Sequence, residues 1–417
     1  MSGTLQCGAL LNNYEFCRML RAKLEFITTL KDLPGDLLRP GCYTSRLRIP
    51  GLMRILIVKL SSIGDVVHTL PAAALLRRAL PDAQIAWVVE RGASAIIEDS
   101  PVLDELITLD TRAWRKDLFS SSAARDARAG LSRLRQPPEL NGAGRADLAI
   151  DFQGLIKSGV IAFASRATRR LGFQTSDLRE TASKLFLTEQ AATSQFKHVI
   201  DKNLALARVA IAATAIKQTD DDGMSNDGYE FPIAVSPDDE RYVRELIEFQ
   251  GGPFAIINPG GGWATKLWPS EHYATLVDWL WDDCALRSLV TYGPGEEALA
   301  HRIVSSARSG AARAVASTLK QFVALARTAA LFVGGDTGPL HLAAASATPI
   351  VGLYGPTSPE RNGPFDPRDI TVGRELWCRA ACHRRSCWHW ECMDIPVNDV
   401  KRAVLNRLEI GGKKRVV

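Results

Sequence analysis

From Met53 onward, short apolar runs alternate with longer stretches in which apolar positions recur at helical spacing. The run Arg-Ile-Leu-Ile-Val-Lys-Leu directly after Met53 opens the first clear strand. Strands joined by helices pair in parallel through right-handed crossovers, so this half predicts a Rossmann-like domain. The predicted strands are 55–60, 84–89, 105–109 and 147–152, and the predicted helices are 72–80, 93–98, 117–134 and 195–213.

A second alternation of the same kind follows a polar stretch at 219–237 that contains Asp, Gly and Pro. Such a stretch is typical of a boundary between domains. The sequence therefore predicts an α/β fold with two facing Rossmann-like domains. In the second half the predicted strands are 254–257, 288–292, 331–333 and 350–353, and the predicted helices are 270–281, 295–307, 319–328 and 397–408.

These patterns divide the chain into parts. Residues 1–52 carry scattered cysteines and only one weakly helical run, so we expect a loosely held N-terminal extension. We expect an N-terminal domain at 53–218, a linker at 219–237, a C-terminal domain at 238–396, and a helix with a basic tail at 397–417.

Composition narrows the class of protein. With 417 residues, 46% hydrophobic and 23% charged, the chain is typical of a soluble globular protein that is long enough for two domains. It has no apolar run of the length of a membrane helix and no pattern of a signal peptide at its start. We therefore expect a cytoplasmic protein whose eight cysteines are mostly reduced.

The net charge of +5 is mild. It suits an anionic small substrate or an anionic membrane surface, and it is too weak to indicate a nucleic-acid partner. The Arg-rich pieces lack interleaved aromatic residues. We expect that the protein binds no nucleic acid.

The turn after the predicted strand at 331–333 is a candidate anion site. Gly334 and Gly335 allow a sharp turn, which leaves Asp336, Thr337 and the amide of Gly338 at the start of a helix. Backbone N–H groups and the helix dipole at such a start favour a diphosphate. The carboxylate of Asp336 would cap the helix or contact hydroxyls and amides nearby, and a plain capped turn is the alternative.

The loop after the first strand offers a base. Small residues, Ser61, Ser62 and Gly64, lead to Asp65 just before a helix. Asp65 can cap that helix, or it can take a proton from an attacking hydroxyl, as glycosyl transfer with inversion requires. His68 is the competing base, although a single His beside an apolar helix is more often structural.

Two further loops could hold a nucleotide. Gly260, Gly261 and Gly262 free backbone amides for phosphate, and Lys266 supplies a cation. The loop is neither a Walker loop nor a Gly-x-Gly-x-x-Gly fingerprint, which argues against an NAD-dependent dehydrogenase. After the next strand, Glu296 could accept the hydroxyls of a ribose or could simply favour a helix start.

Four motifs together resemble a known family, the bacterial lipopolysaccharide heptosyltransferases of glycosyltransferase family nine. The motifs are Val-Lys-Leu-Ser-Ser-Ile-Gly-Asp-Val-Val-His-Thr-Leu-Pro at 58–71, Asp-Phe-Gln-Gly-Leu-Ile-Lys-Ser at 151–158, Lys-Leu-Trp-Pro at 266–269 and Asp-Thr-Gly-Pro-Leu-His at 336–341. The resemblance implies a GT-B fold with a cleft between its domains, an ADP-heptose donor in the C-terminal domain, and no metal or other cofactor.

Within that family the chain is most similar to heptosyltransferase I, which adds the first heptose to Kdo of Kdo-lipid A at the cytoplasmic face of the inner membrane. By position, the resemblance makes Asp65 the catalytic base. It implies donor contacts at Gly261, Gly262, Lys266, Glu296, Ser317, Asp336, Thr337, Gly338 and His341, and acceptor contacts at Ser62, Arg112, Arg115, Lys116, Lys157 and Arg179. Arg pairs bidentately with carboxylates and phosphates, which suits an anionic acceptor.

A cysteine segment leaves the acceptor open. Cys378, Cys382, Cys387 and Cys392 resemble a piece of the second-type heptosyltransferases, so an enzyme with a different acceptor is the alternative, and a sugar-nucleotide-binding module without activity is a more remote one. With His383 and His389 the segment has enough ligands for zinc, but it lacks the tight Cys-x-x-Cys spacing, so we expect reduced structural cysteines.

Overall fold

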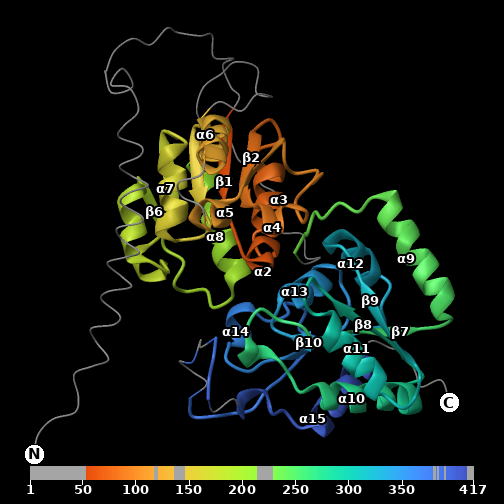
Figure 1. The fold of residues 1–417 in the computed structure, drawn as a ribbon. Helices are drawn as coiled ribbons and strands as arrows, with labels where there is room; N and C mark the ends of the chain where they lie inside the picture. The colour runs from red at the N-terminus through yellow and green to blue at the C-terminus, as the bar shows by residue number, and fades with distance from the viewer. Residues whose placement is uncertain are drawn as a thin grey trace, which may run out of the picture. The chain divides into compact units, whose positions relative to one another are not determined.

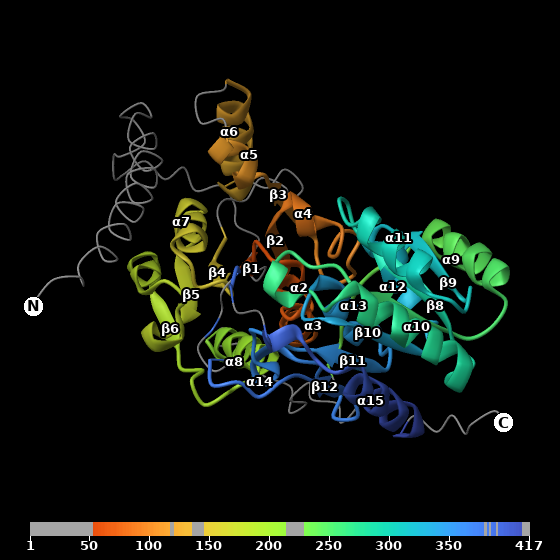
Figure 2. The same cartoon turned by 60° about the horizontal axis from the view of Figure 1, so that its bottom comes forward.

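The central strands of the first sheet are apolar runs. In the computed structural model this sheet has six parallel strands in the order β3-β2-β1-β4-β5-β6 (Figures 1 and 2). Strand β1 is buried along nearly its whole length, as expected for a parallel strand that is covered on both faces. The strands are β1 (Arg54–Val58), β2 (Gln84–Glu90), β3 (Glu105–Leu109), β4 (Leu148–Asp151), β5 (Arg169–Phe173) and β6 (Glu189–Ala191).

The structure describes residues 53–116, 121–135, 146–213, 229–378, 382, 385–388 and 391–410. They all belong to one unit of the chain. The predicted extension at 1–52 lies outside the described residues, as do most of the predicted linker and the end of the basic tail. None of the described helices is long and apolar enough to cross a membrane.

The second sheet repeats the plan of the first. Its order β12-β11-β10-β7-β8-β9 is the first order read from the other edge, and all its pairs are parallel. In both sheets the strand order reverses beside the first strand, which is where open α/β sheets bind ligands. The strands are β7 (Phe254–Asn258), β8 (Arg287–Tyr292), β9 (Ala312–Ala316), β10 (Leu331–Gly335), β11 (Ile350–Leu353) and β12 (Ile370–Val372).

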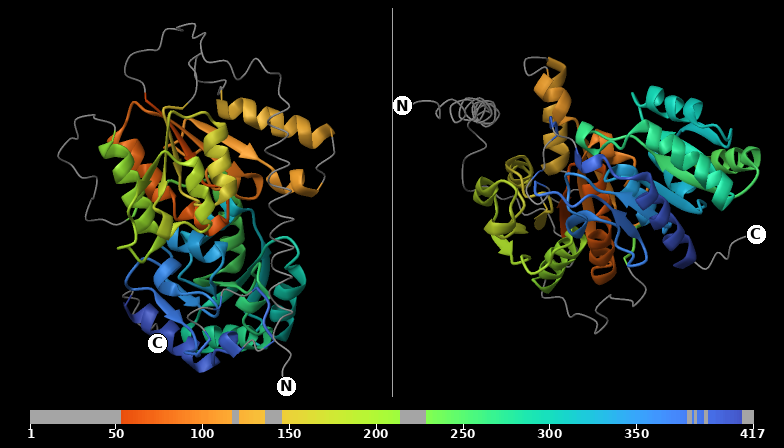
Figure 3. Two further views of the ribbon diagram at one scale, coloured as in Figure 1. Left: turned by 90° about the vertical axis from the view of Figure 1, so that its left-hand side faces the viewer. Right: turned by 90° about the horizontal axis from the view of Figure 1, so that it is seen from below.

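Helices connect the strands of each sheet (Figures 2 and 3). In the first half they are α2 (Ile63–Val67), α3 (Leu70–Ala79), α4 (Arg91–Ser94), α5 (Thr111–Lys116), α6 (Ser121–Arg135), α7 (Ile156–Ala164) and α8 (Val199–Ala212). In the second half they are α9 (Pro237–Gln250), α10 (Ser270–Cys284), α11 (Glu297–Ser306), α12 (Leu319–Ala326), α13 (Gly338–Ala345), α14 (Pro359–Asn362) and α15 (Val397–Ile410).

One hydrophobic core is shared by the two sheets. Side chains of β1 and α3 belong to the same buried cluster as side chains of α12, α13 and β10. Helix α2 of the first half packs directly on α13 of the second. The loops that precede these two helices are therefore held side by side.

Several predicted elements differ from the structure. Helix α4 covers Arg91–Ser94 instead of 93–98, and the predicted helix at 117–134 is replaced by α5 and α6, with 117–120 between them outside the described residues. Strands β5, β6, β9 and β12 were not predicted, because these strands toward the sheet edges carry Arg, Gln or Thr among short apolar runs.

Candidate functional site

Asp65 lies in the crevice at the carboxyl end of β1. Ser62 caps helix α2: its backbone N–H and its Oγ both donate to Oδ2 of Asp65, at 2.9 and 3.2 Å. The carboxylate keeps 21% of its side chain exposed, and Nη1 of Arg179 lies 3.8 Å from Oδ2. Asp65 therefore caps the helix and also faces the crevice.

The buried Lys59 is the strongest cause of the lowered pKa at Asp65. Its side chain is buried, and Nζ donates to the backbone carbonyl of Phe152 at 2.7 Å. Burial by itself would raise the pKa of Asp65, but Lys59 and Arg179 outweigh it and hold that pKa below its ordinary value. The carboxylate is thus ionised at neutral pH and able to accept a proton.

The predicted motif at 151–158 supports this loop. Asp151 accepts from the backbone N–H groups of Gln153 and Gly154 and from Oγ of Ser158. The side chain of Gln153 in turn accepts from the backbone N–H of Leu60 at 3.0 Å. Two strand ends on either side of the crevice are therefore fixed to each other.

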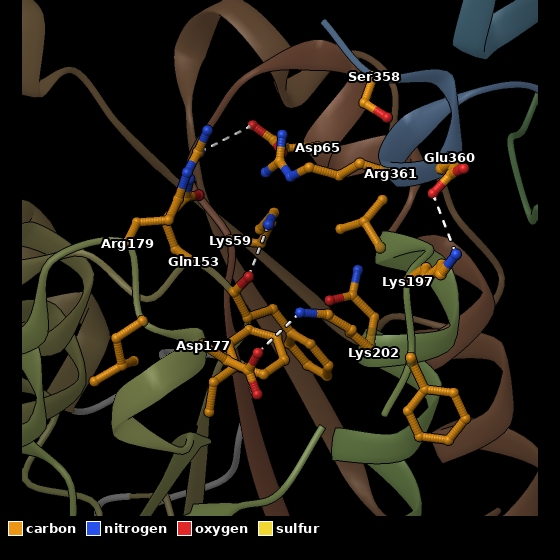
Figure 4. A pocket seen from close by; sticks show the side chains of 16 residues that line it. Lys59, Asp65, Gln153, Asp177, Arg179, Lys197, Lys202, Ser358, Glu360 and Arg361 are labelled. Carbon is orange, nitrogen blue, oxygen red and sulfur yellow. Dashed lines mark hydrogen bonds and ion pairs between the residues drawn. The ribbon is translucent and has the colours of Figure 1, made fainter. Parts of the chain in front are cut away.

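A cavity of about 440 Å³ opens beside Asp65, within the range of ligand sites (Figure 4). Three ion pairs stand around it: Arg179 with Asp65, Lys202 with Asp177, and Lys197 with Glu360. It is lined by Lys59, Asp65, Phe152, Gln153, Phe173, Asp177, Leu178, Arg179, Phe196, Lys197, Val199, Lys202, Asn203, Ser358, Glu360 and Arg361.

Asp336 directly follows β10, beside the point where the strand order of the second sheet reverses, and its buried carboxylate has several hydrogen-bond partners. Nζ of Lys266 donates to its backbone carbonyl and to Oδ2, both at 2.7 Å. Oγ1 of Thr357 donates to Oδ2 at 2.6 Å, Nδ2 of Asn362 donates to Oδ1 at 2.8 Å, and Nε2 of His341 lies 3.1 Å from Oδ1. The carboxylate of Asp336 therefore holds the loop together.

Burial by itself would raise the pKa of Asp336, but His341 and Lys266 hold that pKa well below its ordinary value. Thr337 and Gly338 begin helix α13 directly after this carboxylate. Their backbone N–H groups remain the groups of this turn that suit an anion.

Other predicted donor residues lie around the same loops. Gly261 lies against Thr337, and the carboxyl group of Glu296 lies against Gly260 and accepts from the backbone N–H of Gly293 at 2.9 Å. Gly262 is the next residue of this glycine loop. Ser317 follows β9 and is partly exposed.

The loop and short helix that carry Asp65 contact the start of helix α13. A Cβ on Gly64 would clash with the ring of His341, and a Cβ on Gly338 would come 2.7 Å from Ile63. The ring of His68 packs edge-on against that of His341, with centroids 4.4 Å apart. This buried position makes His68 a packing residue, and it leaves Asp65 as the base candidate that lines the cavity.

The predicted acceptor residues are not all brought together. Arg179 and Ser62 lie beside Asp65, but Nζ of Lys157 donates to Glu90 at 2.6 Å and Lys157 does not line the cavity. Arg112, Arg115 and Lys116 lie on α5, and their side chains are outside the described ones.

Sequence reasoning missed several cavity residues. Lys59 could have been found, since it is a charged residue that directly follows an apolar strand, six positions before Asp65. Lys202 and Arg361 carry no such signal, because only the packing of α14 on α8 brings them to the cavity.

In the C-terminal segment the side chains of Cys378, Cys382 and Cys387 are half-buried, and that of Cys392 is buried. Burial and the neighbouring thiols raise the pKa of Cys392. Among the described residues no group of His, Cys, Asp and Glu could hold a metal ion, and His383 and His389 are outside them.

Comparison with known proteins decides the family. The family model for glycosyltransferase family 9 (heptosyltransferase) matches residues 140–389, more than half of the chain. The chain belongs to glycosyltransferase family 9. It is 28% identical to lipopolysaccharide heptosyltransferase 1 of Pseudomonas aeruginosa over 337 residues, which cover 80% of this chain and 87% of that protein. It is 29% identical to the Escherichia coli K12 protein of the same name over 318 residues, 74% of this chain and 89% of that one.

Solved structures agree with this family. The Escherichia coli heptosyltransferase WaaC with ADP matches with a TM-score of 0.67 and 25% identity, over 85% of this chain and all of that one. The Escherichia coli ADP-heptose heptosyltransferase II matches with a TM-score of 0.65 and 20% identity, over 86% and 100%. The predicted α/β fold of the GT-B type is therefore confirmed, and the protein is a glycosyltransferase.

Proposed function

We propose that this family 9 enzyme transfers heptose from ADP-heptose to Kdo of Kdo-lipid A, in the synthesis of the lipopolysaccharide inner core. The Pseudomonas aeruginosa and Escherichia coli K12 relatives support the choice, because both are named lipopolysaccharide heptosyltransferase 1, and the similar heptosyltransferase WaaC was solved with ADP. The observation that carries the proposal is the ionised Asp65 at the wall of a cavity with surplus positive charge.

In the proposed reaction Asp65 takes the proton of an acceptor hydroxyl. The hydroxyl oxygen forms a bond to the anomeric carbon of the heptose, and the bond from that carbon to the ADP oxygen breaks with inversion. Two carboxylates would play different parts: Asp65 in the crevice accepts the proton, and the buried Asp336 keeps Lys266 and the start of α13 in place.

We assign donor binding to 238–396 and acceptor binding to 53–218. The diphosphate would lie between the glycine loop at Gly261 and Gly262 and the backbone N–H groups at Thr337 and Gly338, with Lys266 close to the leaving ADP. Because the acceptor is a lipid, we propose that the enzyme works in the cytoplasm on the surface of the inner membrane.

The test is the release of ADP from ADP-heptose by the full chain, with Kdo-lipid A and with heptosylated Kdo-lipid A as separate acceptors. The proposal predicts ADP release and a heptose-containing product with Kdo-lipid A only. Turnover with the heptosylated acceptor alone would assign the enzyme to the second type, and binding of ADP-heptose without turnover would make it a binding module.

A further inference from the structure

The cavity beside Asp65 carries more positive than negative charge. Its lining includes the cations Lys59, Arg179, Lys197, Lys202 and Arg361 and the carboxylates Asp65, Asp177 and Glu360. Three cations are paired with these carboxylates, as described above. Lys59 and Arg361 are left over, so the cavity suits an anionic ligand.

Of these two cations, Arg361 is the one that is open to a ligand. Lys59 is buried and donates to the carbonyl of Phe152. Arg361 is exposed, and within the described part of the chain no carboxylate is close enough to form an ion pair with it. Figure 4 shows its guanidinium group next to Asp65, at the wall of the cavity.

Arg361 comes from α14 in the second half of the chain, and its position is fixed from both halves. The next residue, Asn362, donates to Asp336 at 2.8 Å. On the other side, Nε2 of His198 lies 3.1 Å from the carbonyl oxygen of Gly363, and Lys197 pairs with Glu360 at 3.4 Å. The guanidinium group is thus presented by an anchored turn.

The cavity that Arg361 lines suits the acceptor better than the donor. The predicted donor residues of the glycine loop and of the α13 start do not line this cavity, whereas the base candidate Asp65 does. On the proposed function, the acceptor sugar is an acid whose carboxylate is attached to the same ring as its reacting hydroxyl. Arg binds such a carboxylate with two parallel hydrogen bonds.

We propose that Arg361 binds the carboxylate of the acceptor sugar beside Asp65 and so selects an acidic sugar as acceptor. This inference rests on the proposed function. It gives the second half of the chain a part in acceptor recognition. Helix α14 then connects the acceptor cavity to Asp336, because Thr357 and Asn362 both donate to that carboxylate.

The main comparison is between the wild type and Arg361→Gln, on an acceptor with the Kdo carboxylate and on one without it. Wild type and Arg361→Gln are assayed with ADP-heptose and either Kdo-lipid A or the analogue in which the Kdo carboxylate is reduced to an alcohol. With Kdo-lipid A, Arg361→Gln should raise the acceptor KM about 10- to 100-fold and leave the donor KM within about 2-fold. With the reduced acceptor the two enzymes should have the same KM, and Arg361→Lys should recover part of the loss.

Arg368→Gln is the matched control, because Arg368 is an exposed arginine of the same segment that pairs with Asp366 outside the cavity. It should behave as wild type. A third acceptor, Kdo-lipid A without its phosphates, separates the two sources of anionic charge, and the Arg361→Gln loss should persist with it.

The inference is overturned if Arg361→Gln raises the donor KM instead, if its loss is the same with the reduced acceptor, or if the loss disappears with the dephosphorylated one. A wild type that turns over Kdo-lipid A while Arg361→Gln is unaffected also overturns it, with the proposed function intact. A wild type without turnover of Kdo-lipid A contradicts the proposed function itself.

Discussion

Nζ of Lys266 lies 2.7 Å from Oδ2 of Asp336, so the cation expected beside the donor diphosphate is already paired with a buried carboxylate. The side chain of Asp336 is 2% exposed, whereas that of Lys266 is 15% exposed. The pair therefore fixes the position of Lys266, and on the proposed function the carboxylate of Asp336 holds Lys266 in place without contacting the sugar.

Asp336→Asn should destabilise the fold by about 3–5 kcal/mol, because it leaves Lys266 without its buried counterion. Urea unfolding measures this difference. Asp366→Asn is the control: it breaks the surface pair with Arg368, which is worth less than about 1 kcal/mol. Equal losses in the two variants would show that Asp336 does not hold the loop.

Gly64→Ala should cost about 1–3 kcal/mol through overpacking, because the new Cβ would press on the ring of His341. On the proposed function it should also lower kcat, since Asp65, the proposed base, is the next residue. Gly92→Ala on α4 is the matched substitution, because nothing lies within 4 Å of its Cβ. The close packing of α2 on α13 is refuted if both variants keep wild-type stability and kcat.

The pH profile reports the charges around Asp65. Since Arg179 helps to hold the pKa of Asp65 below its ordinary value, kcat/KM of the wild type should fall only at a pH below the one at which an ordinary aspartate takes up its proton. In Arg179→Gln the pKa of Asp65 rises, and the acid limb of kcat/KM should move to higher pH. A limb that stays in place, or moves to lower pH, would contradict this electrostatic role.

Stability should depend on pH through His68. Burial and the neighbouring His341 lower its pKa well below the ordinary value of 6.5. The unfolded chain takes up a proton below pH 6.5 that the folded protein does not, so folding is favoured above this pH and weakened below it. In urea unfolding, the wild type should lose about 2 kcal/mol more than His68→Leu between pH 7 and pH 5.

The exposed His301 provides the control for this measurement. His301→Leu should keep the wild-type dependence on pH. Identical slopes for the wild type and His68→Leu would mean that the His68 ring titrates freely in the folded protein.

The central strands could be predicted from the sequence, and strands toward the sheet edges could not. Buried parallel strands such as β1 and β10 are uninterrupted apolar runs, which a sequence reveals. Strand β5 begins with two arginines, and β6 is only Glu-Gln-Ala. Pairing with a neighbour defines such strands, and no local pattern reports it.

The residues of the candidate site also differ in whether a local sequence pattern indicates them. Asp65 and Asp336 stand in local strand–turn–helix patterns, so the sequence alone indicates them. Lys202 and Arg361 reach the cavity from segments far apart in the chain, and only the packed structure brings them together. Lys157, which the resemblance makes an acceptor contact, lies on α7, and its ammonium group is paired with Glu90.

Whether Asp65 is the base of the proposed reaction is tested by the turnover of Asp65→Asn with ADP-heptose and Kdo-lipid A. The affinity of the variant for ADP is measured alongside. Without a base the variant should lose about 100- to 10,000-fold in kcat. Its affinity for ADP should be that of the wild type, and the exposed Asp82→Asn should keep full turnover. Wild-type turnover by Asp65→Asn would show that Asp65 is not the base.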